Sequence, residues 1–260
     1  MIRYFISDLH LSDKRPDLLR AFVLMTKALL ARKEEAELYI LGDFYEAWIG
    51  DDFQADWNTE IENALVELSQ SGFRLYFLHG NRDFLIGKDW LARVGATFIE
   101  EQTVCLIDDR SVLLTHGDEY CIEDTEYQAF RKTVRSKQWQ EHILAMPLKQ
   151  RIALAAQLRN DSKSSAMEKS MDIMDVSNSA VNASLIHHQC QTVIHGHTHR
   201  PDLHEDESTL RCVLGDWDTH VWLASIKEGI YSQSKATVAT FNQDTLSGLQ
   251  EVHRRALSKK

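Results

Sequence analysis

The stretch QTVIHGHTH, residues 191–199, joins a short apolar run to a tip in which histidines alternate with other residues. Valine and isoleucine favour extended backbone, so the run predicts a buried strand. Alternate side chains of an extended segment point the same way, and His195, His197 and His199 can therefore be aimed at one point. Several imidazoles at one point suggest a metal, although one stretch cannot make a complete site.

Four other stretches repeat this arrangement of an apolar strand followed by a polar tip. The strands are expected within 2–6, 36–43, 74–83 and 111–118, and each leads into a tip that contains Asp, His or Asn. The five tips read SDLHLS, ILGDF, LHGNRD, LLTHGD and IHGHTH. Because strand ends meet at a common edge, we expect these side chains to line one rim of the sheet.

Helical patterns separate the first three strands. Apolar residues recur at helical spacing in 17–32 and 57–72, and the second pattern stops at Gly72, a plausible C-terminal cap. Strands that alternate with helices predict an α/β layered fold.

The polar tips supply a mixed set of oxygen and nitrogen ligands. The set comprises Asp8, His10, Asp43, Asn81, His116 and a pair from the three histidines of 191–199. Such ligands suit Mn²⁺, Fe²⁺, Zn²⁺ or Co²⁺. The set is too large for one tetrahedral ion and is about right for two, and the lack of a thiolate disfavours a structural zinc site.

Composition limits the other possibilities. The 260 residues carry a formal net charge of −10, which argues against general binding to nucleic acid phosphates. The four cysteines are far apart and are expected to be free thiols in a reducing compartment. The sequence shows neither a signal peptide nor a membrane span, so we expect a cytoplasmic protein.

The segment between the fourth and fifth tips differs from the rest. Residues 139–159 show helical spacing interrupted by Pro147, which predicts two or more inserted helices. From 131 to 163 there are eight Lys/Arg residues and two acidic residues. Such a lid suits an acylated, anionic substrate and an anionic bilayer, but a helical hairpin packed on the core with a solvated basic face is equally compatible.

These patterns divide the chain into a core, an insertion and a tail. The core is expected to comprise 1–125 and 181–248, and the insertion 126–180. Within the core, 221–241 is expected to add edge strands. Residues 249–260 are expected to form a solvated C-terminal tail or a short helix.

The ordered motifs D-x-H, G-D, G-N-R-D, H-G-D and G-H-x-H resemble those of the calcineurin-like metallophosphoesterase superfamily. The resemblance runs from Asp8 to His199 and implies an α/β fold, a β-sandwich flanked by helices, here with an inserted helical lid. In that family both histidines of G-H-x-H are ligands, which selects His197 and His199. His195 is then the extra one, either in hydrogen-bonding support of the site or in the core.

The same resemblance implies two divalent ions, with Mn²⁺ the expected metal. One ion would be held by Asp8, His10, Asp43 and His199. The other would be held by Asp43, Asn81, His116 and His197, with Asp43 shared. Two such ions lower the pKa of a shared water and neutralise phosphoryl charge. Asp43 and Arg82 are the expected catalytic residues, Arg82 as a phosphate contact; alternatively Arg82 forms a salt bridge with Asp83.

Further stretches resemble a narrower family, the pyrophosphatases of the lipid A pathway. They are residues 38–52, in which Glu46 replaces the Asp of the commoner G-D-x-x-D, together with 77–88, 126–135 and 173–176. The resemblance implies hydrolysis of UDP-2,3-diacylglucosamine to UMP and 2,3-diacylglucosamine 1-phosphate. It also implies peripheral attachment to the cytoplasmic face of the inner membrane, with no nucleic acid and no obligate protein partner.

Substrate contacts follow from the same resemblance. They are Asn81, Arg82, Asp124, Ser162, Lys169 and His197. The chain departs from the family at Ala166, where the family has Asn. Two further residues have open roles: Arg159 faces either the phosphate or the membrane, and Trp48 lines an acyl-chain groove or belongs to the core.

Two alternatives remain at this point. The first is another metallophosphoesterase, such as a phosphodiesterase for soluble nucleotides, which would not need a basic and apolar lid. The second is a scaffold that keeps the fold without catalysis, which the complete ligand set argues against.

Overall fold

The computed structural model describes residues 1–168, 175–206, 208–241 and 248–258, with the side chains of 161–168 left out. The strands of its first sheet, in spatial order, are β12 (Gln250–Ala256), β11 (Ile230–Thr237), β10 (His220–Lys227), β1 (Ile2–Ile6), β2 (Ala36–Leu41), β3 (Arg74–Leu78) and β4 (Ala96–Phe98). Those of the second are β5 (Thr103–Ile107), β6 (Arg110–Leu114), β7 (Thr192–His195), β9 (Leu210–Val213) and β8 (Asp202–Glu205).

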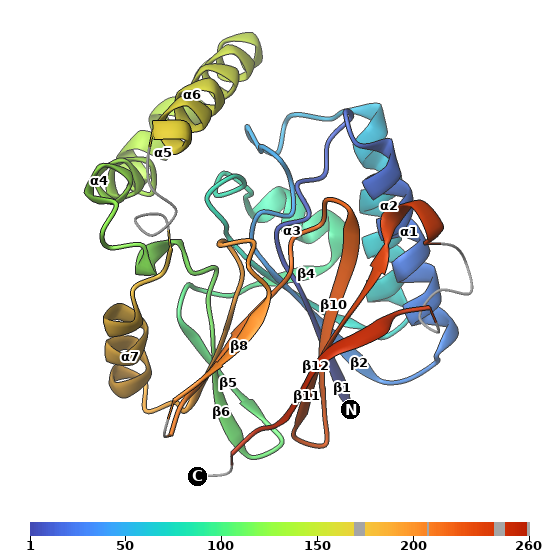
Figure 1. Cartoon of the computed structure of the whole chain (residues 1–260). Coiled ribbons are helices and arrows are strands. Elements are labelled where there is room, and N and C mark those ends of the chain that lie inside the picture. The colour runs from blue at the N-terminus through green and yellow to red at the C-terminus, as the bar shows by residue number, and fades with distance from the viewer. Residues whose placement is uncertain (169–174, 207, 242–247, 259–260) are drawn as a thin grey trace.

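The two sheets pack face to face, with helices on both outer faces (Figure 1). Strands β1 to β4 run parallel, as do β6, β7 and β9. Helices α1 (Pro16–Ala31), α2 (Asp56–Gln70) and α3 (Lys88–Val94) lie on the first sheet, and α7 (Asn178–His187) lies on the second. The arrangement confirms the expected α/β sandwich flanked by helices.

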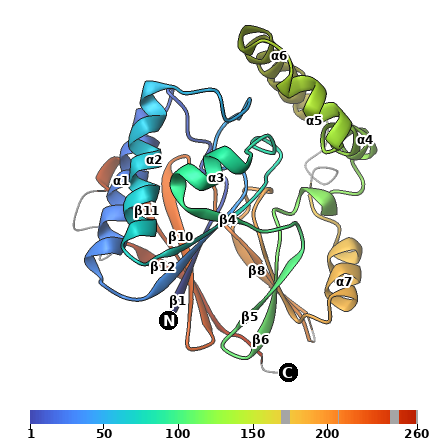
Figure 2. The same ribbon diagram turned by 180° about the vertical axis from the view of Figure 1, so that it is seen from behind.

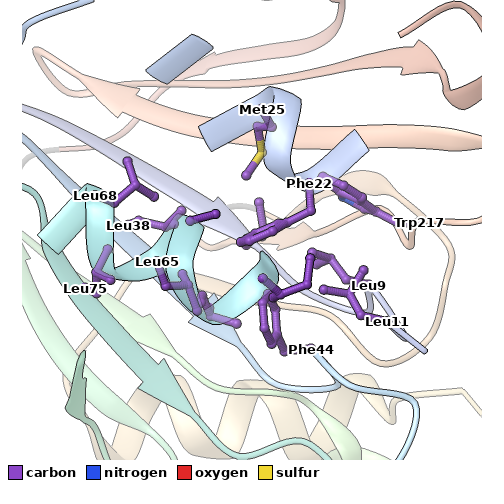
Figure 3. Close-up of a cluster of buried hydrophobic side chains, with 14 of the residues drawn as sticks. Leu9, Leu11, Phe22, Met25, Leu38, Phe44, Leu65, Leu68, Leu75 and Trp217 are labelled. Carbon is purple, nitrogen blue, oxygen red and sulfur yellow. The ribbon is translucent and has the colours of Figure 1, made fainter. Parts of the chain in front are cut away.

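Alternation along the strands explains why they are apolar throughout. In β2, Leu38 and Ile40 pack under the helices, whereas Tyr39 and Leu41 face the second sheet. Both faces of the central strands are therefore buried. Such strands are apolar throughout, whereas a strand with one face in water alternates apolar and polar residues. Figure 3 shows the helical side of this core, where Phe22 and Met25 of α1 meet Leu65 and Leu68 of α2.

The inserted helices stand on the side of the molecule that carries α7 (Figures 1 and 2). They are α4 (Thr125–Val134), α5 (Lys137–Leu144) and α6 (Leu148–Glu168). Pro147 lies between α5 and α6, as the interrupted pattern predicts. The expected boundary at 180/181 falls inside α7, whose Val181 and Leu185 pack on the second sheet, so the division into core and insertion stays a proposal.

The C-terminal segment corrects two expectations. Residues 250–256 are solvated as expected, but they form β12, which pairs antiparallel with β11, instead of a tail or a helix. Consequently β10 and β11 are interior strands of the sheet rather than its edge. The segment is nearly all polar because an edge strand needs only backbone pairing on one side and exposes its side chains.

Two further observations concern the thiols and the helices. None of the four cysteines is assigned to a disulfide within the described residues, which agrees with the expectation from their spacing. Within the described residues, none of the helices has both the length and the apolar character needed to cross a bilayer.

Candidate metal centre

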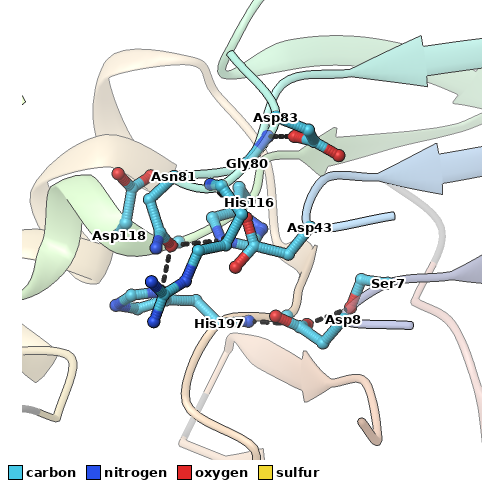
Figure 4. Close-up of polar contacts among 12 residues, drawn as sticks. Ser7, Asp8, Asp43, Gly80, Asn81, Asp83, His116, Asp118 and His197 are labelled. Atoms are coloured by element: carbon cyan, nitrogen blue, oxygen red, sulfur yellow. Dashed lines mark hydrogen bonds and ion pairs between the residues drawn. The ribbon is translucent and has the colours of Figure 1, made fainter. Parts of the chain in front are cut away.

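Five strands from both sheets end at one edge of the sandwich, and the polar tips meet there. Asp8 and His10 follow β1, Asp43 follows β2 and Asn81 follows β3 of the first sheet. His116 follows β6 of the second sheet, and His197 and His199 follow β7. The expected single rim is thus shared by two sheets, since β6 and β7 run parallel in the second sheet, and Figure 4 shows Asp8, Asp43, Asn81, His116 and His197 gathered there.

One group of ligands gathers around Asp8. His199 Nε2 lies 3.4 Å from Asp8 Oδ1, and His10 Nε2 lies 4.0 Å from the same oxygen. The two imidazole Nε2 atoms are 3.2 Å apart. Three ligand atoms directed at one point are the geometry of a cation site.

A second group gathers around Asn81. Its Oδ1 lies 3.0 Å from His116 Nε2 and 2.9 Å from His197 Nδ1. Asp43 Oδ1 is 3.7 Å from His116 Nε2. Ligand atoms of Asp8, Asp43 and His116 lie within 4.8 Å of one another, so Asp8 reaches both groups, and the shared role expected for Asp43 stays a prediction.

The donors present fit divalent cations. Asp8 is fully buried, and its Oδ1 accepts no hydrogen bond within the described residues. His199 Nε2 lies 3.4 Å from this oxygen without an aligned hydrogen bond, and a bound cation would offset the remaining cost of burying the carboxylate. Carboxylate, amide and imidazole are the donors that borderline divalent ions accept.

The charges of the metal-free centre are distributed unevenly among its histidines. Burial lowers the pKa of His116, but the carboxylates of Asp43 and Asp8 outweigh burial and raise it to about 9. His199 behaves similarly, because Asp8 raises its pKa to about 9 against the effect of burial. Burial lowers the pKa of His197 to about 4, so that ring is neutral. In the metal-free centre, protonated histidines balance the charge of the carboxylates. A bound metal ion would take over that role, because imidazoles bind metals in their neutral form.

A buried carboxylate holds two of the ligand loops together. Asp83 Oδ1 accepts a hydrogen bond from the amide of Gly80 at 2.8 Å, and Oδ2 accepts from the amides of Phe44 at 2.8 Å and Tyr45 at 3.4 Å. Asp83 is therefore occupied by backbone, and its expected alternative role as a salt bridge to Arg82 is wrong. The Arg82 guanidinium has no ion-pair partner in the part of the chain that the structure describes, whereas its amide donates to Asp43 Oδ1 at 2.8 Å.

Five of the seven expected ligands occupy left-handed backbone. They are Asp8, His10, Asp43, His197 and His199, with φ between 48° and 68°. Side chains other than glycine rarely adopt this region, so the loops hold the ligands in a sparsely populated conformation. Gly80 meets a related demand, because a Cβ there would collide with the Asp43 carboxylate.

Three further carboxylates touch the site although the sequence did not single them out as site residues. Glu46 Oε2 lies 3.0 Å from His10 Nδ1, and Asp216 Oδ2 lies 3.4 Å from His199 Nδ1. Asp118 is fully buried beside the second group. The only available signals were the replacement of Asp by Glu46 in G-D-x-x-D and the last letter of H-G-D.

The remaining sequence predictions fall outside the ligand cluster. His195 is fully buried, contacts the carbonyl of Gly196 at 2.9 Å and has a pKa lowered to about 3 by burial, so it is a neutral core residue. Trp48 is also a core residue, stacked on Tyr45. Asp124 caps α4 by accepting from the amide of Tyr127 at 3.0 Å.

Three lid residues can be placed only in part. Ser162 and Ala166 belong to α6, but the structure describes only their backbone. Lys169 lies outside the described residues altogether. Their expected contacts with substrate stay predictions.

Arginines of the lid attach it to the core. Arg131 and Arg135 both reach Asp118, at 2.8 and 3.7 Å, and Arg135 also donates to the carbonyl of Gly80 at 2.9 Å. Arg151 donates to the carbonyl of Ile49 at 2.6 Å and pairs with Asp52. Arg159 pairs with Glu46. Half of the eight basic residues of 131–163 are therefore paired with the core instead of facing solvent.

The chain is similar to a known family and to several named proteins. Residues 3–201 match the family described as calcineurin-like phosphoesterase. A relative from Marinobacter nauticus named UDP-2,3-diacylglucosamine hydrolase is 46% identical over 228 residues, covering 85% of this chain and 92% of its own. A relative of the same name from Pseudomonas syringae pv. tomato is 42% identical over 246 residues, covering 91% and 98%. A solved structure described as GAP50, the anchor in the inner membrane complex of Plasmodium, matches all of this chain and 89% of its own with a TM-score of 0.52 at 11% identity, which shows a shared fold alone.

Proposed function

The chain belongs to the calcineurin-like phosphoesterase family, and from that premise we propose that it hydrolyses the diphosphate bond of UDP-2,3-diacylglucosamine in lipid A biosynthesis. The products would be UMP and 2,3-diacylglucosamine 1-phosphate. The observation that carries the proposal is the likeness, 40–46% identical over most of the chain, to relatives named UDP-2,3-diacylglucosamine hydrolase.

The side chains of the rim support the same chemistry. Two divalent ions, with Mn²⁺ as the proposed metal, would supply an activated water and neutralise phosphoryl charge when bound. Asp8, His10 and His199 would hold one ion, and Asn81, His116 and His197 the other, with Asp43 as a further ligand. The Arg82 guanidinium, which has no ion-pair partner among the described residues, would bind a phosphate oxygen and orient the diphosphate.

Exposed residues of the lid support contact with an acylated substrate at a membrane surface. Phe130, Leu144 and Ile152 are large apolar side chains that remain exposed. Lys132, Lys137 and Lys149 are exposed on the same three helices and would be attracted to an anionic bilayer. We therefore propose peripheral attachment at the cytoplasmic face of the inner membrane.

The test is hydrolysis of UDP-2,3-diacylglucosamine in mixed micelles with Mn²⁺, followed by chromatographic detection of UMP. We expect UMP release by the wild-type chain and loss of about 10³-fold or more in Asp43→Ala, because a metal ligand is removed. Glu60→Ala, which removes an exposed carboxylate of α2, serves as the surface control. If the chain cleaves bis(p-nitrophenyl) phosphate with Mn²⁺ but leaves the glycolipid intact, the proposed substrate is wrong and the phosphodiesterase alternative is favoured.

A further inference from the structure

Glu46 contacts both the metal centre and the lid. Its Oε2 lies 3.0 Å from His10 Nδ1, on the side of the ring opposite the ligand atom Nε2. Its Oε1 pairs with the guanidinium of Arg159 on α6. A single carboxylate therefore joins a metal-ligand residue to a helix more than a hundred positions later in the chain.

The backbone fixes Glu46 on the His10 side of this link. The Glu46 amide donates to the carbonyl of Leu11 at 3.1 Å, and the Leu11 amide donates to the carbonyl of Phe44 at 3.0 Å. Leu11 and Tyr45 form a parallel bridge. Because the two loops are tied together by backbone bonds, the carboxylate stays beside the ring whether or not the lid is present.

The lid side of the link depends on side chains only. Arg159 and Arg151 both come from α6, and both contact the segment 46–52 that follows Asp43. Two guanidinium groups, about two helical turns apart, thus dock one helix on one loop. Movement of α6 would break the Arg159 pair and change the charge that the Glu46 carboxylate presents to His10.

The His10 contact has room to respond. The Nδ1 atom is within hydrogen-bond distance of Glu46 Oε2, yet it makes no well-aligned hydrogen bond. A small rotation of either group would align the N–H with the carboxylate. Carboxylates behind ligand histidines fix the ring orientation and tautomer, and their loss typically weakens metal binding by about 10–100-fold.

We propose that Glu46 is a positioning residue that couples docking of α6 to the orientation of His10, so that the lid and the metal centre stabilise each other. The proposal rests on the metal centre put forward above, not on the identity of the substrate. Coupling of this kind is reciprocal: if docking of α6 tightens metal binding, metal binding must favour docking of α6 by the same factor.

The first experiment titrates Mn²⁺ by calorimetry in the absence of substrate. We expect Glu46→Gln to weaken one of the two binding events by about 10-fold. Arg159→Gln should weaken the same event by about 5-fold, although Arg159 contacts no ligand itself. In the Glu46→Gln background, Arg159→Gln should have no further effect. Lys149→Gln, an exposed cation of the same helix, is the matched control and should leave the affinity unchanged.

The second experiment measures hydrogen exchange of α6 with and without Mn²⁺. We expect the metal to slow exchange in α6 of the wild type and to have no such effect in Glu46→Gln, whose circular dichroism reports that it is folded. The proposal is overturned if Arg159→Gln binds Mn²⁺ like the wild type, even if it loses turnover, since Arg159 would then act on substrate alone. Neither readout involves the glycolipid, so failure of the proposed substrate leaves this test intact.

Discussion

The metal rim and the lid are both rich in charged side chains, yet they are held in opposite ways. The rim places Asp8, Asp43 and His116 at strand ends, where each is at most 2% exposed and backbone bonds fix the loops. The lid reaches the core through long arginine side chains, such as Arg151 and Arg159, and through a few apolar side chains, such as Ile143. Groups fixed by the backbone are ordered when the chain folds, whereas tethered groups lose side-chain entropy at every contact. We infer a rigid centre beside a lid that is held less firmly than the centre.

The largest effect on stability should come from the rim, at Asp83. Asp83→Ala leaves the buried amides of Gly80 and Phe44 without an acceptor and should lower the free energy of unfolding by about 3 kcal/mol. Urea denaturation of the metal-free protein measures this loss. Asp83→Asn keeps one acceptor oxygen and should recover part of it. An unchanged urea midpoint in Asp83→Ala would mean that the loops are not held through this carboxylate.

A smaller effect, also confined to the rim, is the pH dependence of the metal-free protein. His116 and His199 have pKa values raised to about 9 in the folded state, above the ordinary value of 6.5. Their contribution to stability is therefore complete below about pH 6.5 and is lost as the pH rises through 9. Unfolding in EDTA at pH 6 and pH 9 tests the sign, and greater stability at pH 9 would contradict it.

The lid should respond locally rather than globally. Arg151→Ala removes a hydrogen bond to the Ile49 carbonyl and the pair with Asp52, and should change the free energy of unfolding by only about 1 kcal/mol. Proteolysis within α6 should nevertheless become several-fold faster, because a tether is lost. If the free energy of unfolding and the resistance of α6 to proteolysis fell together by several kcal/mol, the lid would be part of the rigid core. The inferred difference between the lid and the rim would then be wrong.

The smallest effect is expected for lid cations that face solvent. Replacing Lys132, Lys137 and Lys149 together by Gln should change the free energy of unfolding by less than about 0.5 kcal/mol. Binding to vesicles that contain anionic lipid should weaken, because each lysine near such a surface contributes about 1 kcal/mol. Co-sedimentation with neutral and anionic vesicles measures this. If the variant and the wild type bind anionic vesicles equally well, these lysines do not attach the lid to the membrane.

The same contrast separates what could be predicted from the sequence from what could not. The ligand residues stand directly after apolar strands, so local patterns were enough to bring Asp8, Asn81 and His116 to one edge. The role of Asp83 was not predictable, because two of its three amide partners, Phe44 and Tyr45, lie 39 and 38 positions earlier and their direction depends on the packed loops.

The lid shows a second reason for missing information. Eight basic residues in one segment suggested a surface for anions, but four arginines meet acids such as Asp52 that lie far away in the sequence. Composition counts charges and says nothing about their partners. Strand β12 was missed for a related reason, since an exposed edge strand has no apolar alternation to reveal it.

The left-handed backbone of the ligand loops has a consequence for the metal-free protein. The left-handed conformation costs each ligand residue in it roughly 1 kcal/mol of folding free energy relative to glycine. These residues are Asp8, His10, Asp43, His197 and His199. Replacing one of them by glycine would relax the backbone at that position but would remove the hydrogen bonds and ion pairs of the side chain, such as the contacts of Asp43 and Asp8. These side chains therefore hold the rim backbone in its sparsely populated conformation before any metal binds.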